Sequence, residues 1–201
     1  ERVFEFLEED EEKDTSKGNI DTTKLKGNVQ FNHVKFGYNP ERTIIKDFNC
    51  NVKDGQKIAI VGPTGAGKTT MVKLLMRFYD VTEGAILVDG INIKDFKRGD
   101  LRKMFGMVLQ DTWLFGGSVK DNIKYGKEDA TVEDIIQSAK AAHVHHFIKT
   151  LPNGYNSILN EESSNVSAGQ KQLLTIARVI LTDPKILILD EATSSIDTRT
   201  E

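Results

Sequence analysis

The chain has 201 residues, of which 38% are hydrophobic and 28% are charged, and its formal net charge is -3. This length suits one domain, or one domain with an appendage, and the composition excludes a wholly disordered chain. The acidic balance provides no basic field for neutralising phosphates, which argues against nucleic acid as the main partner. No apolar run approaches the ~18 residues of a membrane span, and the single cysteine, Cys50, cannot form an internal disulfide.

Residues 1–26 differ in composition from the rest of the chain. A short apolar face at residues 3–7 is followed by five consecutive acidic residues at 8–12. Like charges this close repel one another, and so polar a segment cannot offset its ordering entropy. The pattern therefore predicts a helix end that runs into a linker, with the folded domain at residues 27–201.

The next part of the chain has the two-residue period of strands. Val29 and Phe31 alternate, and the apolar phase then shifts by one residue at Val34, which predicts a β-bulge near residues 32–33. The apolar runs within residues 57–61 and at residues 186–189 are typical of parallel strands that are buried on both faces. The predicted strands lie at residues 29–38, 48–52, 57–61, 84–89, 105–109 and 186–189.

Helical periodicity separates these strands. An amphipathic helix is predicted over residues 68–79, and residues 118–182 are predicted to be mostly helical. Thr131 with Asp134, and Ser167 with Gln170, have the spacing of capping boxes. The order of elements predicts an α/β fold with a mostly parallel sheet, an antiparallel β part at the N-terminus and an inserted helical part at about 112–182.

A complete phosphate-loop motif follows the predicted strand at 57–61. The spacing G-x-x-x-x-G-K-[ST] predicts a backbone that curls so that its N–H groups point at phosphate oxygens, with the positive end of a helix behind them. Lys68 is expected to bridge the terminal phosphates, and the Thr69 hydroxyl to hold Mg²⁺. The residues assigned to nucleotide binding are Gly62, Pro63, Thr64, Gly65, Ala66, Gly67, Lys68, Thr69 and Thr70.

Two further patterns complement this loop. Asp190 and Glu191 follow the apolar run at 186–189, and α/β sheets place their ligands at the carboxyl ends of strands. Asp190 is therefore expected to hold Mg²⁺ and Glu191 to activate water as the general base. Ser167 and Gly169 open a helix whose N–H groups form a second anion-binding tip.

These motifs together resemble the nucleotide-binding domain of ATP-binding cassette (ABC) transporters, a P-loop NTPase, over residues 29–201. The family usually has Leu-Ser-Gly-Gly-Gln where this chain has Val-Ser-Ala-Gly-Gln at 166–170. The resemblance implies that Tyr38 stacks on adenine and that Gln110 contacts Mg²⁺ and the attacking water. It also implies a head-to-tail dimer, in which Ser167, Gly169 and Gln170 face the ATP of the other subunit.

The resemblance is greatest to exporters, and residues 2–7 resemble the exit from an exporter's transmembrane domain. It implies an ATPase at the cytoplasmic face of the cell membrane, with a second nucleotide-binding domain, identical or different, and a transmembrane domain as partners. The family's switch histidine lies one strand beyond Asp197, so the chain is expected to be truncated before it and to hydrolyse bound MgATP poorly. Trp113 and Phe115 are interpreted as core rather than as an interface.

Three alternatives remain open on the residues alone. A small-molecule kinase shares the phosphate loop, but it needs an acceptor pocket rather than a second anion-binding tip. A soluble ABC-type ATPase that is not coupled to transport is disfavoured by the acidic balance and by the N-terminal segment. A nucleotide sensor that does not hydrolyse ATP is disfavoured by Glu191.

Overall fold

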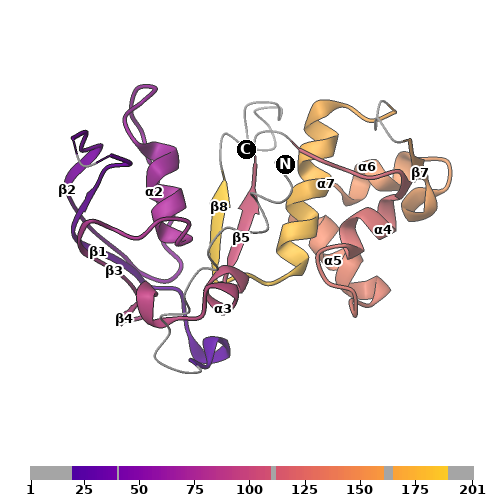
Figure 1. Ribbon diagram of the computed structural model, residues 1–201. Coiled ribbons are helices and arrows are strands. Elements are labelled where there is room, and N and C mark those ends of the chain that lie inside the picture. Colours follow the sequence, from indigo (N-terminus) through magenta and orange to yellow (C-terminus); the bar gives the residue numbers. More distant parts are fainter. Residues whose placement is uncertain (1–19, 40, 110–111, 161–164, 190–201) are drawn as a thin grey trace, which may run out of the picture. The chain divides into compact units, whose positions relative to one another are not determined.

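The computed structural model describes residues 20–39, 41–109, 112–160 and 165–189 (Figure 1). The chain divides into two units, Glu1–Arg102 and Lys103–Glu201. Most of the predicted linker at residues 1–26 lies outside the described residues. Among the described residues, none of the helices is both long and apolar enough to cross a bilayer.

The first unit is built on a four-stranded antiparallel sheet in the order β2-β1-β3-β4. In β1 the alternating side chains of Val29 and Phe31, and then of Val34 and Phe36, are buried. This confirms the predicted antiparallel part at the N-terminus. The strands are β1 (Val29–Phe36), β2 (Ile45–Val52), β3 (Glu83–Val88) and β4 (Ile91–Asn92).

Strand β1 contains the predicted bulge. Its register with β2 shifts after Phe31 and its register with β3 shifts after Asn32, and His33 adopts a φ of 49°. A Cβ at Gly84 of β3 would lie 2.1 Å from the carbonyl oxygen of His33, so only glycine fits opposite the bulge. The bulge explains how the apolar phase can change while Val34 stays in the core.

A two-residue turn joins β3 to β4. Both of its residues, Asp89 and Gly90, have positive φ, as a type I′ turn requires. The Asp89 carboxylate accepts hydrogen bonds from the backbone N–H groups of Lys26 and Gly27 at 2.8 Å and of Asn28 at 3.2 Å. Burial alone would raise the pKa of Asp89, but these hydrogen bonds outweigh it and hold the pKa below its usual value. The turn therefore attaches residues 26–28, which precede β1, to the end of β3.

Residues 57–61 do not form the predicted buried strand. They have no strand conformation, and Ile58, Ile60 and Val61 are 54%, 53% and 86% exposed. A parallel strand exists only through hydrogen bonds to its neighbours, and among the described residues no strand pairs with this segment. The apolar side chains of residues 57–61 favour burial, but the first unit by itself does not bury them.

Helix α2 (Lys68–Leu75) is shorter than predicted, since the predicted helix extended to Tyr79. It ends in a Schellman motif, in which the N–H of Phe78 donates to the carbonyl of Lys73 at 2.8 Å. Arg77, with a φ of 54°, occupies the left-handed position where glycine is usual. Phe78 and Tyr79 therefore lie beyond the helix, and they are 51% and 43% exposed.

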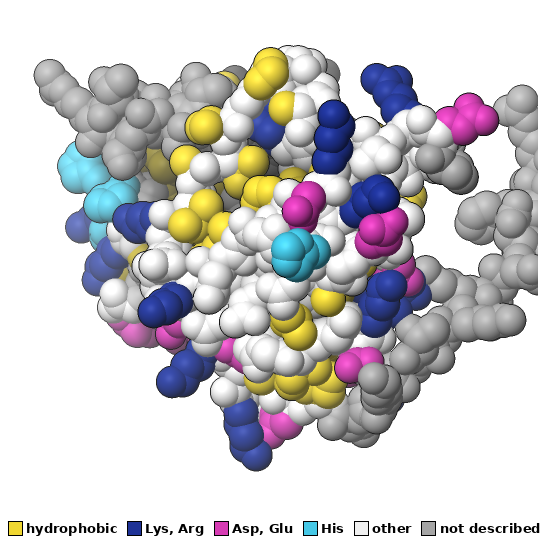
Figure 2. Space-filling model, turned by 90° about the vertical axis from the view of Figure 1, so that its left-hand side faces the viewer, with side chains coloured by type: hydrophobic (Ala, Val, Ile, Leu, Met, Phe, Trp, Pro, Cys, Tyr) yellow, Lys and Arg dark blue, Asp and Glu magenta, His cyan; other side chains and the backbone are white. Residues whose placement is uncertain are grey.

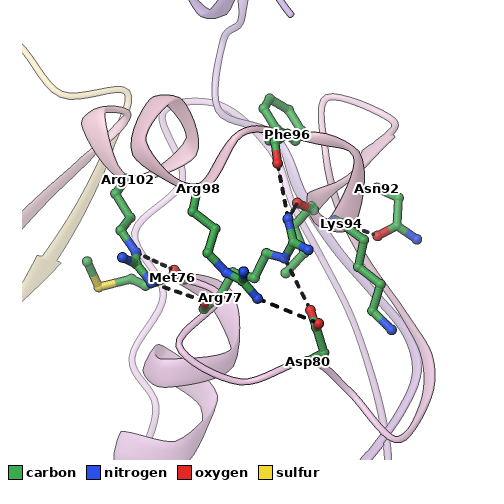
Figure 3. Close-up of polar contacts among 9 residues, drawn as sticks. Met76, Arg77, Asp80, Asn92, Lys94, Phe96, Arg98 and Arg102 are labelled. Carbon is green, nitrogen blue, oxygen red and sulfur yellow. Dashed lines mark hydrogen bonds and ion pairs between the residues drawn. The ribbon is translucent and has the colours of Figure 1, made fainter. Parts of the chain in front are cut away.

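The side chain of Arg77 explains why an arginine occupies that position. It is fully buried, and it bonds Asp80 through Nε at 3.1 Å and the carbonyl of Phe96 through Nη1 at 3.0 Å (Figure 3). A further bond reaches the carbonyl of Ile93 in the 3-10 helix η2 (Ile93–Asp95). These charge-assisted bonds offset the left-handed backbone of a non-glycine residue.

Helix α3 (Arg98–Lys103) also contacts the end of α2. Arg102 donates hydrogen bonds to the carbonyls of Met76 and Arg77, each at 3.3 Å (Figure 3). A cation at the C-terminal end of a helix satisfies its last carbonyls and opposes the negative end of its dipole. The helix that begins at the phosphate loop is therefore anchored at its far end by two arginines.

The second unit combines one parallel strand pair with the predicted helical insertion, and α7 packs against β5, α4 and α5 (Figure 1). The pair is β5 (Phe105–Val108) with β8 (Ile186–Leu189), and the helices lie between these strands in the sequence. The other elements are α4 (Val119–Lys124), α5 (Val132–Ala141), α6 (His145–Thr150), α7 (Ala168–Leu181), η3 (Gly154–Asn156), and the antiparallel pair β6 (Gly117–Ser118) and β7 (Ile158–Leu159).

Both predicted capping boxes are present. Thr131 and Asp134 exchange hydrogen bonds at the start of α5, and Ser167 and Gln170 do so at the start of α7. Helix α7 ends as predicted before Asp183, whose φ is 49°. The helices share a core in which the following side chains are less than 2% exposed: Val119, Ile123, Ile135, Ala139, Val144, Ile148, Leu159, Leu174 and Ala177.

Strand β8 forms where predicted but is not buried on both faces. Leu187 and Leu189 are 45% and 49% exposed. Among the described residues β5 is its only partner, and a strand with one neighbour keeps an open edge. The apolar pattern therefore identified the strand correctly and overestimated its burial.

Candidate phosphate-binding site and associated surfaces

The phosphate loop, residues 62–69, joins the segment at 57–61 to α2. The Lys68 ammonium donates to the carbonyl of Gly62 at 2.7 Å and to that of Pro63 at 3.1 Å. The loop closes on itself through a hydrogen bond from the Ala66 N–H to the Pro63 carbonyl at 3.1 Å. Lys68 is thus folded back over the loop, and its charge lies against the carbonyl groups at the start of the loop.

Glycine is required at two positions of this loop. Gly65 and Gly67 have φ values of 82° and 91°, a region that other residues rarely adopt. Gly67 is the N-cap of α2 and has no side chain that could cap it, so the first turn of the helix can donate its N–H groups to an anion. Thr69 is exposed in that turn, where its hydroxyl can serve as a metal ligand.

A cavity of about 310 Å³ lies beside the loop within the first unit. It is lined by Ile44 and the first four residues of β2, by Ile60 and Val61, and by residues 66–68 with Met71. Figure 2 views the side on which β2 and α2 lie and shows hydrophobic side chains at the surface there. The cavity has the size of a small-ligand site, and Lys68 of the phosphate loop is among its lining residues.

Tyr38, the predicted adenine contact, lies beside the loop helix. Its hydroxyl is 3.3 Å from Oγ1 of Thr70, which is buried in the first turn of α2. The ring is 45% exposed and packs against Phe36 and Tyr79. The structure therefore brings Tyr38 together with the phosphate loop. The contact with Tyr79 was not predicted, because the apolar period placed Tyr79 on α2.

The second predicted anion-binding tip is the start of α7. Ser167 Oγ accepts from the N–H of Gln170 at 3.2 Å, and the Gln170 side chain accepts from the N–H of Ser167 at 2.8 Å. The Ser167 hydroxyl can still donate its proton while it accepts this bond. Ser167 is exposed and Gly169 is half-buried, so the tip is open to a ligand at its serine.

An aromatic cluster of the second unit surrounds Arg178 of α7. The guanidinium carbon lies 5.8 Å from the ring centre of Trp113 and 5.4 Å from that of Tyr125. Both rings are exposed, at 59% and 64%, and Phe115 packs against them. The interpretation of Trp113 as core is wrong, because its ring stacks at the surface on a cation.

Arg178 is itself held firmly. It donates to the backbone carbonyl of Asn122 at 2.7 Å, to the Asn122 side chain at 3.0 Å and to the carbonyl of Trp113 at 3.0 Å. Burial lowers the pKa of Arg178, and the nearby Tyr125 opposes this shift. These bonds join α7, whose N-cap is Ser167, to α4 and to the segment before α4. No sequence motif had singled out Arg178.

Three predicted site residues, Gln110, Asp190 and Glu191, lie outside the described residues. Their roles as metal ligands and general base therefore remain predictions. The described site residues fall into two groups: the loop, Thr70 and Tyr38 belong to the first unit, whereas Ser167, Gly169 and Gln170 belong to the second.

Comparison with known proteins identifies the class to which this loop and fold belong. A family model described as ABC transporter matches residues 45–194. Over 201 residues, the chain is 50% identical to a fatty acid ABC transporter ATP-binding/permease protein of Mycobacterium bovis, of which it spans 32%. It is 46% identical to a putative multidrug export ATP-binding/permease protein of Bacillus subtilis, of which it spans 35%.

Comparison with a solved structure indicates the same family for the fold. The structure of a bacterial Atm1-family ABC exporter with ATP bound matches 99% of this chain and 35% of that chain, with a TM-score of 0.84 and 37% identity. The loop and the fold are thus those of a P-loop nucleotide-binding domain. The chain belongs to the ABC transporter family, and it matches the ATP-binding part of these relatives. It spans about a third of the length of the curated relatives it matches.

Proposed function

We propose that the chain is the ATP-binding and ATP-hydrolysing motor domain of an exporter at the cytoplasmic face of the cell membrane. The observation that carries this proposal is the phosphate loop, which has the Lys68 ammonium held against it and the uncapped first turn of α2 at its end. The named relatives are ATP-binding/permease proteins, which supports a link between this domain and a membrane domain.

Each site residue has a distinct role in the proposed reaction. Lys68 and the loop N–H groups hold the terminal phosphates and stabilise the charge that develops on them in the transition state. Thr69, Gln110 and Asp190 are hydroxyl, amide and carboxylate oxygen donors, which fit Mg²⁺. The bound Mg²⁺ supplies neutralisation of phosphate charge. Glu191 accepts a proton from the attacking water.

The Ser167 tip completes the site of a second copy in this proposal. A helix start with a serine hydroxyl and free N–H groups is suited to the γ-phosphate. The γ-phosphate would then contact both subunits, so its loss on hydrolysis removes contacts that hold the dimer together. This gives the domain a nucleotide-controlled change between paired and separated states.

A membrane domain is the other proposed partner. The exposed Trp113 and Tyr125, with the half-buried Phe115 packed against them, form an aromatic patch of the kind found at protein interfaces. Arg178 holds that patch on α7, so a partner docked there would be connected to the helix that starts at Ser167. Residues 1–26 are proposed as the link to the membrane domain.

Hydrolysis by the full-length protein tests the proposal. Glu191→Gln should abolish phosphate release while ATP binding persists, because only the proton acceptor is removed. Glu133→Gln, on the exposed face of α5, is the matched control and should leave turnover unchanged. Transfer of the phosphate to an acceptor other than water would favour a kinase, and unchanged turnover in Glu191→Gln would refute the assignment of the base.

A further inference from the structure

The ring of Tyr38 is held from three directions. Phe36 and Tyr79 each meet it with ring centres 5.1 Å apart, at interplanar angles of 83° and 82°. Its hydroxyl contacts Thr70 at 3.3 Å. Such edge-to-face pairs stabilise the arrangement of the rings beyond the effect of the area that they bury. Tyr38 nevertheless keeps nearly half of its surface exposed, so a ligand can stack on it.

The position of Tyr79 is set by the turn that ends α2. Arg77, two residues earlier, is buried and bonded to the carbonyl of Phe96, and Asp80, the next residue, bonds Arg77 at 3.1 Å (Figure 3). Phe78 is covered by the guanidinium of Arg102 at 4.5 Å. Tyr79 therefore lies in a segment whose neighbouring residues are held by these contacts, and its backbone has little freedom to move away from Tyr38.

These contacts give Tyr79 a function that packing alone does not require. Tyr79 is 43% exposed and is not one of the buried residues that form the core. It packs against Tyr38, and also against Phe36 at 5.8 Å. Phe36 is buried and belongs to the sheet, whereas Tyr79 follows the helix of the phosphate loop. Tyr79 thus links the orientation of the Tyr38 ring to the element that binds phosphate.

We infer that Tyr79 is a positioning residue for the nucleotide base: it holds the Tyr38 ring in the orientation that stacks on a purine beside the phosphate loop. The inference rests on the proposed function, in which Tyr38 contacts the base. It predicts that Tyr79 affects only ligands that carry a base, and that it acts through Tyr38.

The test compares the affinities of the full-length protein for ATP and for inorganic tripolyphosphate, which has no base. Tyr79→Leu should weaken ATP binding about fivefold, the value of a lost aromatic contact, and leave tripolyphosphate binding unchanged. Tyr79→Phe keeps the ring and should bind both ligands like the wild type. Tyr79→Met serves the same purpose as Tyr79→Leu if that variant does not fold.

A double-mutant cycle identifies the route of the effect. If Tyr79 acts through Tyr38, Tyr79→Leu should have no further effect in a Tyr38→Ala background. Two results would overturn this inference and leave the proposed function intact. In the first, Tyr79→Leu weakens the binding of ATP and of tripolyphosphate equally. In the second, Tyr38→Ala weakens ATP binding but Tyr79→Leu does not. If Tyr38→Ala leaves ATP affinity unchanged, the proposed role of Tyr38 fails first, and the inference fails with it.

Discussion

Ser167 and Gln170 hold each other at the start of α7, each side chain accepting a hydrogen bond from the other's backbone N–H. Thr131 and Asp134 make the same arrangement at the start of α5. The two boxes are alike in their local chemistry, but only the first lies in a motif that is predicted to contact nucleotide. The chain therefore contains an internal control for separating a capping role from a binding role.

Ser167→Ala and Thr131→Ala should each lower the free energy of unfolding by about 1 kcal/mol, the usual value of a lost N-cap. Chemical denaturation measures this loss. Only Ser167→Ala should also weaken MgATP-dependent association of the domains, as measured by analytical ultracentrifugation. If both variants associate like the wild type, the α7 tip is a cap and nothing more.

Asp89 provides a test of how the first unit is held together. Asp89→Asn should lower the free energy of unfolding by about 2 kcal/mol at pH 7, because three backbone N–H groups lose a charged acceptor. The pKa of Asp89 is lower in the folded chain than the ordinary value of 3.8, so this stabilisation is complete above that value and disappears as the pH falls through the folded pKa.

Urea unfolding from pH 7 to pH 3 measures this difference. The difference in the free energy of unfolding between the wild type and Asp89→Asn, called the gap below, should become smaller as the pH falls. Asp54→Asn, at an exposed position in the turn after β2, is the control and should show a gap near zero throughout. A gap for Asp89→Asn that stayed constant across the whole range would contradict the account of its hydrogen bonds.

The cluster at Arg178 can be followed through Trp113, the single tryptophan of the chain. Arg178→Lys retains the charge but cannot reproduce the planar fork that reaches Asn122 and Trp113 together. We expect a loss of about 2 kcal/mol in stability and stronger acrylamide quenching of Trp113. Unchanged quenching would mean that the arginine does not hold the aromatic ring.

Local signals in the sequence predicted much of the fold. The phase shift at Val34 located the bulge, and residue spacing located both capping boxes, since each feature depends on neighbours within a few residues. The phosphate loop was recognisable because its glycines and Lys68 are required by the loop's own geometry.

The features that sequence reasoning missed depend on distant partners. Helix α2 ends at an arginine rather than at a glycine, because the Arg77 side chain reaches the carbonyl of Phe96. Trp113 looked like core, yet its cation partner Arg178 is 65 positions away. The run at 57–61 was expected to be buried, but hydrophobicity alone does not supply the neighbouring strands that a buried strand needs.

The central claim is that two copies share each nucleotide, with the Lys68 loop of one and the Ser167 tip of the other. Two variants of the full-length protein, one with Lys68→Ala and the other with Ser167→Ala, are expressed together so that mixed dimers can form. ATP hydrolysis by this mixture is compared with that of each variant expressed alone. Half of the dimers are then mixed and have one intact site of two, so about a quarter of wild-type activity should return. A mixture no more active than the single variants would contradict the shared site.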